Sequence, residues 1–207
     1  MKKIDDIFVV HFIPTLEAGG AETQLQNLVC HSKKMGVDSK IITLSALETA
    51  ITSNIKGKGI EVEVIDLSKG KIKGLFKLCQ LFSRLDAGST VLHSWMYHAN
   101  FLTIIAKCIN WRLKIVWGIR RTEIPQSGGA AFFTKVCSFF SRFVPNKVVF
   151  NSSAGLKTHE NIGYYSRVLC VIPNAIDCEK FKLNRLPCYD IESSNLNSEC
   201  IKNIGVI

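Results

Sequence analysis

The opening segment of the chain constrains the fold class more than any other feature of the sequence. Residues 7–13 form a run of β-branched and aromatic side chains that is too short for a helix, and Pro14 closes it. Gly19 and Gly20 follow, and residues 21–35 then place apolar side chains at helical spacing. The order of buried strand, glycine turn and helix is typical of the first unit of a parallel sheet.

The same alternation continues along most of the chain. Beyond the first unit, the hydrophobic pattern predicts strands at 37–44, 60–65, 90–92, 113–118, 147–150 and 168–172, and helices at 47–57, 71–85, 97–109, 130–143 and 152–160. Strands that alternate with helices are joined by crossovers, which makes neighbouring strands parallel. We therefore expect an α/β fold over residues 4–172, with a Rossmann-like, doubly wound parallel sheet.

The pattern changes after Asn174. Residues 182–200 lack a strong period and are rich in Ser, Asn and acidic side chains, as a linker is. Residues 201–207 are apolar again, as the first strand of a second domain would be. We therefore expect a Rossmann-like domain over residues 1–178, a linker over 179–200, and the start of a truncated second domain at 201–207.

Composition and charge limit the classes of protein and partner. Apolar residues make up 47% of the chain and charged residues 21%, which excludes a disordered chain, a collagen and a coiled coil. Lys and Arg number 26 against 17 Asp and Glu, so the net charge is +9. Such a charge favours a polyanionic partner, whether nucleic acid, anionic lipid or a phosphorylated substrate.

The cysteines and the N-terminus indicate a cellular compartment. The eight cysteines stand singly, without a CxxC pair, and most lie inside apolar runs, where reduced Cys behaves as a small core side chain. Two acids precede the first apolar stretch and no small-residue cleavage site follows, which argues against a signal peptide. No apolar run approaches the roughly 18 residues of a membrane span. We expect a cytoplasmic protein that reaches any membrane from its cytoplasmic surface.

The turn at residues 17–22 is the first candidate for a binding site. It opens the first helix, where free backbone N–H groups and the helix dipole attract a phosphate, and Gly19 and Gly20 let a ligand approach the backbone. The alternative is a tight connection whose glycines serve packing. The turn is not GxGxxG and no acid ends the second strand, so a nicotinamide enzyme is disfavoured.

Residues 93–100 lie beyond the predicted end of a strand, where open parallel sheets bind ligands. His93, Trp95, Tyr97 and His98 together suit stacking on a sugar and hydrogen bonding to its hydroxyl groups. The two histidines are also potential zinc ligands, but no third ligand with suitable spacing accompanies them. A purely structural role is the alternative for His98.

Arg120 and Arg121 follow the next predicted strand at the equivalent edge. Their guanidinium groups could bind phosphates through two hydrogen bonds each. For Arg121, an exposed pairing with Glu123 is the alternative.

Basic residues dominate the middle of the chain. Residues 101–150 hold eight Lys or Arg and one acid, Glu123. The predicted helix that includes Phe132, Phe133, Val136, Phe140 and Phe143 places these side chains on one face, with Lys135 and Arg142 off it. Such a helix suits an anionic membrane, and the alternative is an ordinary helix that covers the sheet. Five further cations precede this region at Lys69, Lys71, Lys73, Lys77 and Arg84.

Several motifs follow one another in a definite order: 13–23 with its Gly-Gly-Ala-Glu turn, 93–100, 116–120, 151–153, His159, 163–164, and 171–177 followed by Phe181. In this order they closely resemble the N-terminal half of family 4 glycosyltransferases. The likeness spans nearly the whole chain. The Gly-Gly-Ala-Glu turn and the Ile-Pro-Asn-x-Ile-Asp…Phe signature are individually moderate signals and jointly strong.

The resemblance implies a GT-B fold, in which two Rossmann-like domains face each other across a cleft. Residues 1–178 would form the N-terminal, acceptor-binding domain, while the donor-binding domain is absent or only begun. The resemblance also implies transfer of a sugar from a nucleotide sugar with retention, and without a metal or other cofactor.

The resemblance implies that Gly19 and Gly20 face the donor diphosphate. From its side chain and position, we expect Arg120 to face the diphosphate as well. The residues expected to bind the acceptor are His93, Trp95, Tyr97, His98 and Arg121, and those expected in the interdomain loop are Asn174 and Asp177. Family members often carry a histidine just beyond the strand that ends here at Trp117, and Arg120 or Arg121 stands in that region instead. The catalytic group is therefore left unassigned.

The expected function is sugar transfer to a saccharide acceptor, lipid-linked at the inner membrane face, in cell-surface polysaccharide or lipopolysaccharide biosynthesis. The expected partners are a nucleotide sugar, this acceptor and the anionic inner-membrane surface. We expect the isolated chain to be inactive, because the second domain supplies most donor contacts in this family. The alternative function is a non-catalytic acceptor- or membrane-binding subunit that recruits a separate donor-binding domain. A nucleic-acid partner rests on charge alone, without a reader motif, and is not expected.

Overall fold

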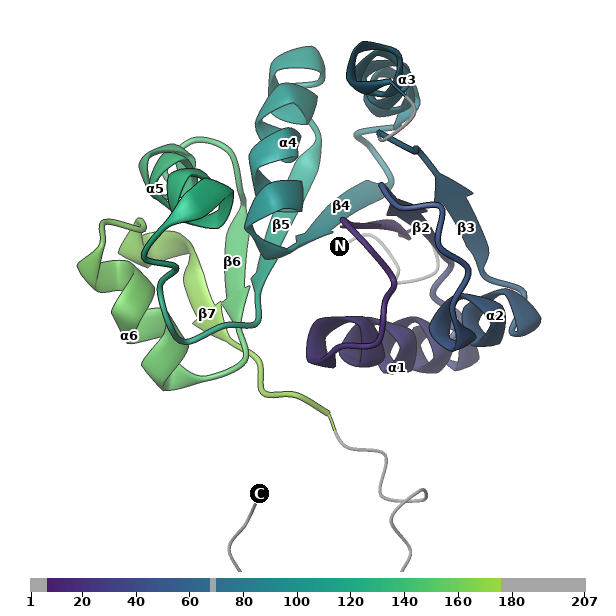
Figure 1. The fold of residues 1–207 in the computed structure, drawn as a ribbon, viewed down its shortest axis with the longest axis horizontal. Coiled ribbons are helices and arrows are strands. Elements are labelled where there is room, and N and C mark those ends of the chain that lie inside the picture. Colours follow the sequence, from purple (N-terminus) through teal and green to yellow (C-terminus); the bar gives the residue numbers. More distant parts are fainter. Residues whose placement is uncertain (1–6, 68–69, 176–207) are drawn as a thin grey trace, which may run out of the picture. The chain divides into compact units, whose positions relative to one another are not determined.

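Seven parallel strands form one sheet in the computed structural model, which describes residues 7–67 and 70–175 (Figure 1). The strands are β1 (Phe8–Ile13), β2 (Ser39–Thr43), β3 (Glu61–Val64), β4 (Thr90–Trp95), β5 (Lys114–Ile119), β6 (Lys147–Phe150) and β7 (Leu169–Val171). Their order across the sheet is β3-β2-β1-β4-β5-β6-β7, and every neighbouring pair is parallel. The predicted α/β fold is confirmed.

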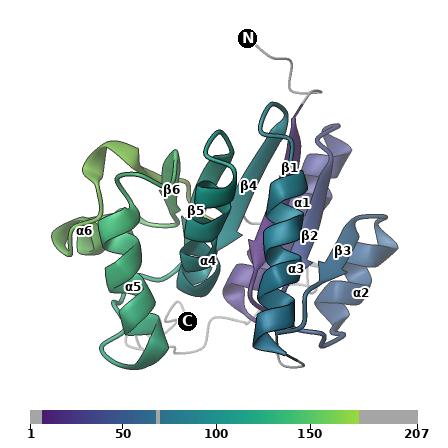
Figure 2. The same cartoon turned by 90° about the horizontal axis from the view of Figure 1, so that it is seen from above.

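Helices cover both faces of the sheet, as buried parallel strands require. They are α1 (Gly20–Lys34), α2 (Ala50–Gly57), α3 (Lys71–Arg84), α4 (Met96–Ile109), α5 (Gly128–Phe140) and α6 (Ser153–Asn161), with a 3₁₀ turn at Ser166–Val168. Helices α1 and α2 lie on one face, whereas α3, α4 and α5 form a row on the other (Figures 1 and 2). Helix α6 contacts β6 and β7 at one edge of the sheet. The sheet is therefore doubly wound.

The apolar core is divided by the sheet into two clusters. Neighbouring residues of a strand point to opposite faces, so Ile42 joins one cluster and Ile41 the other. The larger cluster packs strand residues such as Phe12 and Trp117 against α3, α4 and α5. The smaller one includes Leu25 and packs α1 and α2 against the other face. Each face thus has its own buried layer.

Strand β4 is longer than predicted, which corrects the expectation that residues 93–95 lie beyond the strand. The strand was expected to end at residue 92, but it continues to Trp95, and α4 begins at the next residue. The reason is pairing on both sides, because His93 lies opposite His11 of β1 and Trp95 lies opposite Gly118 of β5. Pairing with both neighbours therefore extends the strand over residues 93–95, which the hydrophobic pattern places beyond its end.

The apolar residues of α5 do not share one face, which corrects a second expectation. Phe133 and Phe140 pack against the larger core cluster, whereas Phe132 and Phe143 are exposed. The fully buried residues of the helix are Thr134 and Cys137. A helix that is apolar around much of its circumference gives no clear signal for the side that faces the sheet. The helix therefore both covers the sheet and presents apolar side chains to solvent.

Parts of the predicted organisation lie outside the described residues. They include Asp177, the linker at 179–200 and the apolar segment at 201–207. Lys69, one of the expected basic residues, also lies outside them. The expected division into domains therefore stays a prediction.

Candidate functional site

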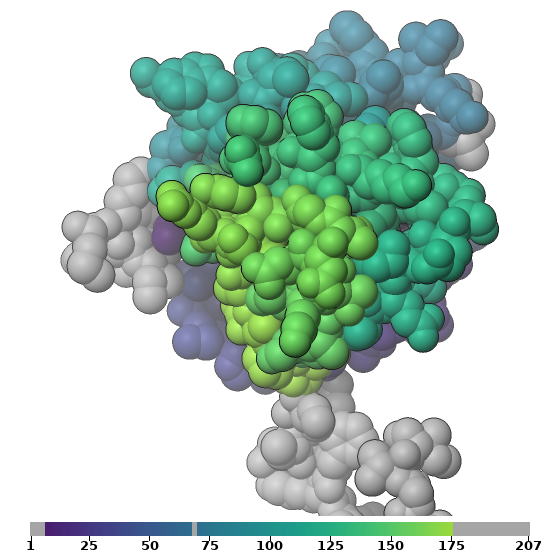
Figure 3. Space-filling view, turned by 90° about the vertical axis from the view of Figure 1, so that its left-hand side faces the viewer, coloured from purple at the N-terminus to yellow at the C-terminus, as the bar shows by residue number. Residues whose placement is uncertain are grey.

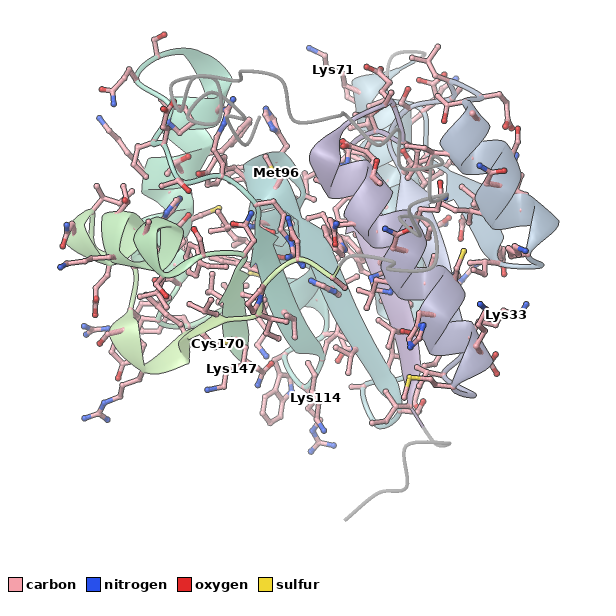
Figure 4. The ribbon with its side chains drawn as sticks, turned by 90° about the horizontal axis from the view of Figure 1, so that it is seen from below. Lys33, Lys71, Met96, Lys114, Lys147 and Cys170 are labelled. Atoms are coloured by element: carbon pink, nitrogen blue, oxygen red, sulfur yellow. The ribbon has the colours of Figure 1, made fainter. Side chains whose placement is uncertain are left out.

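The candidate site lies where β1 and β4 are neighbours at the carboxyl edge of the sheet. From β1 the chain proceeds to α1 on one face, and from β4 it proceeds to α4 on the other face. This reversal is the position at which open α/β sheets bind ligands. Met96 marks the edge in Figure 4, with Lys114 and Lys147, which begin β5 and β6, at the opposite edge.

The junction between β4 and α4 has an unusual backbone. Met96 has a φ of 68° and is the one non-glycine residue with a positive φ among the described residues. A long side chain in the left-handed region costs free energy and is found often at functional sites. The change from strand to helix in a single residue thus occurs at the same edge as the glycine turn.

The glycine turn leaves the start of α1 open on the solvent side. Gly19 is the N-cap of α1 in extended conformation, and a Cβ added to Gly20 would meet no atom within 4 Å. The packing explanation for Gly20 therefore finds no neighbour in the described part of the chain. The first N–H groups of a helix have no acceptor within the helix, so this turn can present them to an anion.

An acidic side chain already lies beside this turn. A Cβ added to Gly19 would collide with the carboxylate of Glu22, which shows that this carboxylate folds back over the Gly19 backbone. A negative charge in the first turn of a helix is stabilised by the helix dipole. Glu22 thus occupies part of the space that an approaching phosphate would use.

Three aromatic side chains form a column on the face of the sheet covered by α1. The indole Nε1 of Trp95 donates to Nδ1 of His11 at 3.3 Å. The ring centroids of His93 and Trp95 are 4.7 Å apart, and those of His11 and His93 are 5.3 Å apart. Gly118 leaves room for this column, because a Cβ there would lie 3.1 Å from Nε2 of His93.

Both histidines of the column are held neutral. Burial lowers the pKa of His11 to about 3. Burial also lowers the pKa of His93 well below its usual range, and repulsion of its charged form by Arg120, and by His11 where that ring is charged, lowers it further. The Nε2 atom of His93 is buried and has no hydrogen-bond partner in the described part of the chain. This nitrogen can still donate to or accept from a ligand hydroxyl group.

Arg120 continues the column toward the edge of the sheet. Its guanidinium carbon lies 4.8 Å from the ring centroid of Trp95, and its Nη1 donates to Oδ1 of Asn174 at 2.9 Å. Burial lowers its pKa, but an arginine stays protonated. The Nε atom is buried and unpaired within residues 7–67 and 70–175. A fixed cation with unused donor capacity therefore lies at the candidate site.

The segment after β7 returns to the site. Asn174 accepts from Arg120, and the carbonyl oxygen of Ala175 accepts from Nε2 of Gln24 on α1 at 3.2 Å. The structure thus connects the glycine-turn helix, Arg120 directly after β5, and the start of the predicted interdomain loop at one edge.

The predicted acceptor residues divide into several groups. His93 lies in the column, but the rings of Trp95 and Tyr97 are buried, so neither is free to stack on a sugar in this structure. The hydroxyl of Tyr97 instead pairs with Nε2 of His159 at 2.7 Å. His98 is exposed on α4, with its ring 4.8 Å from that of Phe133, and Arg121 is exposed beyond β5. Burial lowers the pKa of His98.

Sequence reasoning missed His11 and Gln24. His11 lies inside an apolar strand and carries no local signal of a site. Only the register of β1 against β4, which places it beside His93, identifies it. Gln24 likewise has no motif of its own.

No group of three His, Cys, Asp or Glu side chains within residues 7–67 and 70–175 is arranged to hold a metal ion. In the same residues, no helix is long and apolar enough to cross a bilayer.

Comparisons with known proteins give one family and a consistent set of structures. The family model for Glycosyltransferase Family 4 matches residues 18–180. A comparison with curated protein sequences finds no match.

Similar solved structures share the fold at low sequence identity. HepE of Anabaena, solved in complex with UDP and with UDP-glucose, has a TM-score of 0.69 at 18% identity, over 84% of this chain and 45% of its own. A glycosyltransferase of Rickettsia africae has a TM-score of 0.62 at 14% identity, over 85% and 45%. The lipopolysaccharide outer core galactosyltransferase WaaB has 0.59 at 9% identity, over 82% and 46%. The chain thus spans less than half the length of these proteins.

Proposed function

The chain belongs to Glycosyltransferase Family 4, and from this membership we propose that it is the acceptor-side half of an enzyme that transfers a sugar from a nucleotide sugar to a saccharide. Its fold corresponds to one half of GT-B glycosyltransferases. HepE, whose structures contain UDP and UDP-glucose, supports a nucleotide sugar as the kind of donor. The donor-binding half would supply the remaining contacts to the nucleotide.

One observation carries the proposal: the open start of α1 and the guanidinium of Arg120 lie at the same edge of the sheet. The first N–H groups of α1 and the cation at Arg120 suit a diphosphate, which develops negative charge as the sugar leaves. Preorganised donors and cations stabilise such charge in the transition state. We propose that Gly19, Gly20 and Arg120 contribute this stabilisation, with retention at the transferred sugar and without a metal ion.

On the acceptor side, we propose that His93 contributes a hydrogen bond to a hydroxyl group of the saccharide. Its buried, unpaired Nε2 supports this role. WaaB, a lipopolysaccharide galactosyltransferase by its description, favours a cell-surface polysaccharide or lipopolysaccharide as product. The acceptor would be lipid-linked and reached from the cytoplasmic face of the inner membrane. Asn174 and Asp177 would lie in the connection to the donor-binding half.

Nucleotide binding by the 207-residue chain tests the proposal. The probes are UDP, GDP and inorganic pyrophosphate, added to ¹⁵N-labelled protein. We expect shifts of the backbone amide signals at residues 20–22 and of the Nε signal of Arg120, with millimolar affinity because the donor-binding half would supply most of the contacts. We also expect negligible sugar transfer by this chain alone.

A pair of glycine variants separates binding from folding. Gly20→Val places a side chain over the open turn, so binding should weaken by about tenfold or more. Gly57→Val, at the end of α2, is the matched control, because an added Cβ there also meets nothing within 4 Å. Amide shifts that avoid residues 20–22 in the parent chain, or equal loss of binding in both variants, would contradict the proposed phosphate site.

A further inference from the structure

The row formed by α3, α4 and α5 carries an excess of positive charge. None of these three helices contains an Asp or a Glu. Their cations are Lys71, Lys73, Lys77, Arg84, Lys107 and Lys135. A helix that only shields a sheet from water usually carries both signs of charge on its outer side.

Helix α3 exposes apolar side chains between its lysines. Ile72 is 87% exposed and Phe76 is 63% exposed. Lys71, Lys73 and Lys77 alternate with them and are exposed as well. The core contacts of the helix come instead from Leu78, Leu81 and Phe82 on its inner side, where Gly74 is also buried. The outer apolar residues are therefore not needed to hold α3 on the sheet.

Helix α5 has the same outer composition. Phe132 is 59% exposed, Phe139 is 69% exposed, and Phe143, just beyond the helix, is 63% exposed. Lys135 is exposed between the first two, and Arg142 lies next to Phe143 with its guanidinium over the ring of Tyr165. Phe132 contacts the rings of Phe101 and Phe133, and Phe139 contacts those of Phe140 and Phe143. More than half of each outer side chain nevertheless stays exposed to water.

The two helices belong to one continuous side of the molecule. Helix α4 contacts both α3 and α5, and Figure 2 shows the three helices as a row in front of the sheet. Figure 3 looks onto the side of the molecule where α5, at one end of the row, lies next to α6. We call the exposed residues Lys71, Ile72, Lys73, Phe76, Lys77, Phe132, Lys135, Phe139 and Phe143 the outer apolar-basic surface.

We propose that the outer apolar-basic surface docks on an anionic lipid bilayer, with its phenylalanine rings in the interface and its lysines against the headgroups. Exposed aromatic rings interleaved with cations are the composition of helices that lie in a membrane interface. Each lysine near an anionic surface adds about a fivefold gain in affinity, by the usual 1 kcal/mol per basic residue. This inference deepens the proposed function and rests on it, because a domain docked on the membrane can reach a lipid-linked acceptor.

Other occupants fit the surface less well. A second copy of the chain would bring the same cations face to face in a symmetric dimer, which is repulsive. The phosphates of a nucleic acid would pair with the cations, but the apolar residues between them would have no apolar surface to contact. Both remain measurable outcomes of the test.

Vesicle sedimentation with the 207-residue chain tests the docking surface. The probes are vesicles of phosphatidylcholine alone and vesicles that also contain phosphatidylglycerol. We expect binding to the mixed vesicles that falls as salt shortens the Debye length from about 10 Å to about 3 Å. The variant Lys71→Gln, Lys73→Gln, Lys77→Gln should lose about 100-fold in affinity. The variant Phe132→Ser, Phe139→Ser, Phe143→Ser should lose at least about tenfold.

Matched controls on other parts of the molecule exclude effects of net charge or general hydrophobicity. Lys34→Gln, Lys58→Gln removes exposed lysines of the α1 and α2 side, and Met35→Ser, Leu47→Ser removes apolar residues of similar exposure. These variants should change vesicle affinity by less than about threefold. Equal losses in the controls would overturn the proposal. So would equal binding to both kinds of vesicle, binding to neither, self-association through the surface, or binding of a polynucleotide in place of vesicles.

The nucleotide titration of the preceding subsection uses the same protein without vesicles. Loss of vesicle binding with intact nucleotide shifts would therefore contradict the docking surface alone. Vesicle binding without nucleotide shifts would contradict the proposed transferase site alone.

Discussion

Each of the two helix layers of this protein covers one face of the sheet, but the outer surfaces of the layers differ in composition. In the first layer, α1 carries Glu22, and Lys56 of α2 pairs with Glu48 in the loop that precedes this helix. The row of α3, α4 and α5 carries cations and exposed phenylalanines without any acid in the helices. The fold depends only on the inner side of each layer, so the outer sides are free to differ.

The two layers also bury histidine in different ways. On the α1 face, His11 accepts the indole N–H of Trp95 and lies beside His93. On the opposite face, His159 pairs with the Tyr97 hydroxyl and with the carbonyl oxygen of Gly155. The first arrangement leaves His93 with an unpaired nitrogen at the candidate site, whereas the second uses both nitrogens of its histidine. We therefore expect ligand binding on the α1 face and a structural role for His159 on the other.

The largest expected effect is a loss of folding stability at acid pH that arises from His11 on the α1 face. His11 has a pKa lowered to about 3 in the folded chain, so the unfolded chain binds more protons as the pH falls below about 6.5. Stability that is complete above that pH is therefore lost toward lower pH, by about 2 kcal/mol at about pH 5 for this residue. Urea unfolding at about pH 7 and about pH 5 measures the loss.

The variant His11→Gln keeps an acceptor for the indole of Trp95 and removes the titrating group. Its stability should fall less between the two pH values than that of the parent chain. The control His31→Gln changes an exposed histidine of α1 and should leave the loss unaltered. An unchanged pH dependence in the His11 variant would show that this histidine is not what makes the α1 face sensitive to acid.

A smaller effect is expected on the α4 side. Tyr97→Phe removes the hydroxyl that pairs with His159 and leaves the buried Nε2 without its partner, which should cost about 1.5 kcal/mol. Thermal or urea unfolding measures this cost. The control Tyr165→Phe, under the guanidinium of Arg142, should cost less than about 0.5 kcal/mol. A Tyr97 variant with full stability and weakened saccharide binding would restore this residue to the acceptor site.

The smallest effect should come from the outer apolar-basic surface. Phe139→Ser should change the free energy of unfolding by no more than about 0.5 kcal/mol, because the ring is mostly exposed. Phe140→Ser, on the neighbouring residue that packs against the core, should cost several times more. Equal losses for the two variants would show that the outer rings serve the fold, and would remove the contrast between the sides of α5.

Much of the fold was predictable because its signals are local. Periods of two and of 3.6 residues locate strands and helices within a window of about ten residues, and the glycine turn marks the first crossover. The end of β4 was not predictable in this way. Its last residues are strand only because β1 and β5 supply partners on both sides, and those partners are distant in the sequence.

The candidate site is likewise divided between features that are local in the sequence and features that depend on distant residues. The sequence by itself determined the glycine turn at the start of α1 and the presence of Arg120 after a strand, since both follow from local order along the chain. Only the tertiary structure decided that His11 lies beside His93, that Arg120 stacks on Trp95 and pairs with Asn174, and that Trp95 and Tyr97 are buried. The physical reason is register, because parallel pairing aligns side chains that are tens of residues apart, and no local pattern records that alignment.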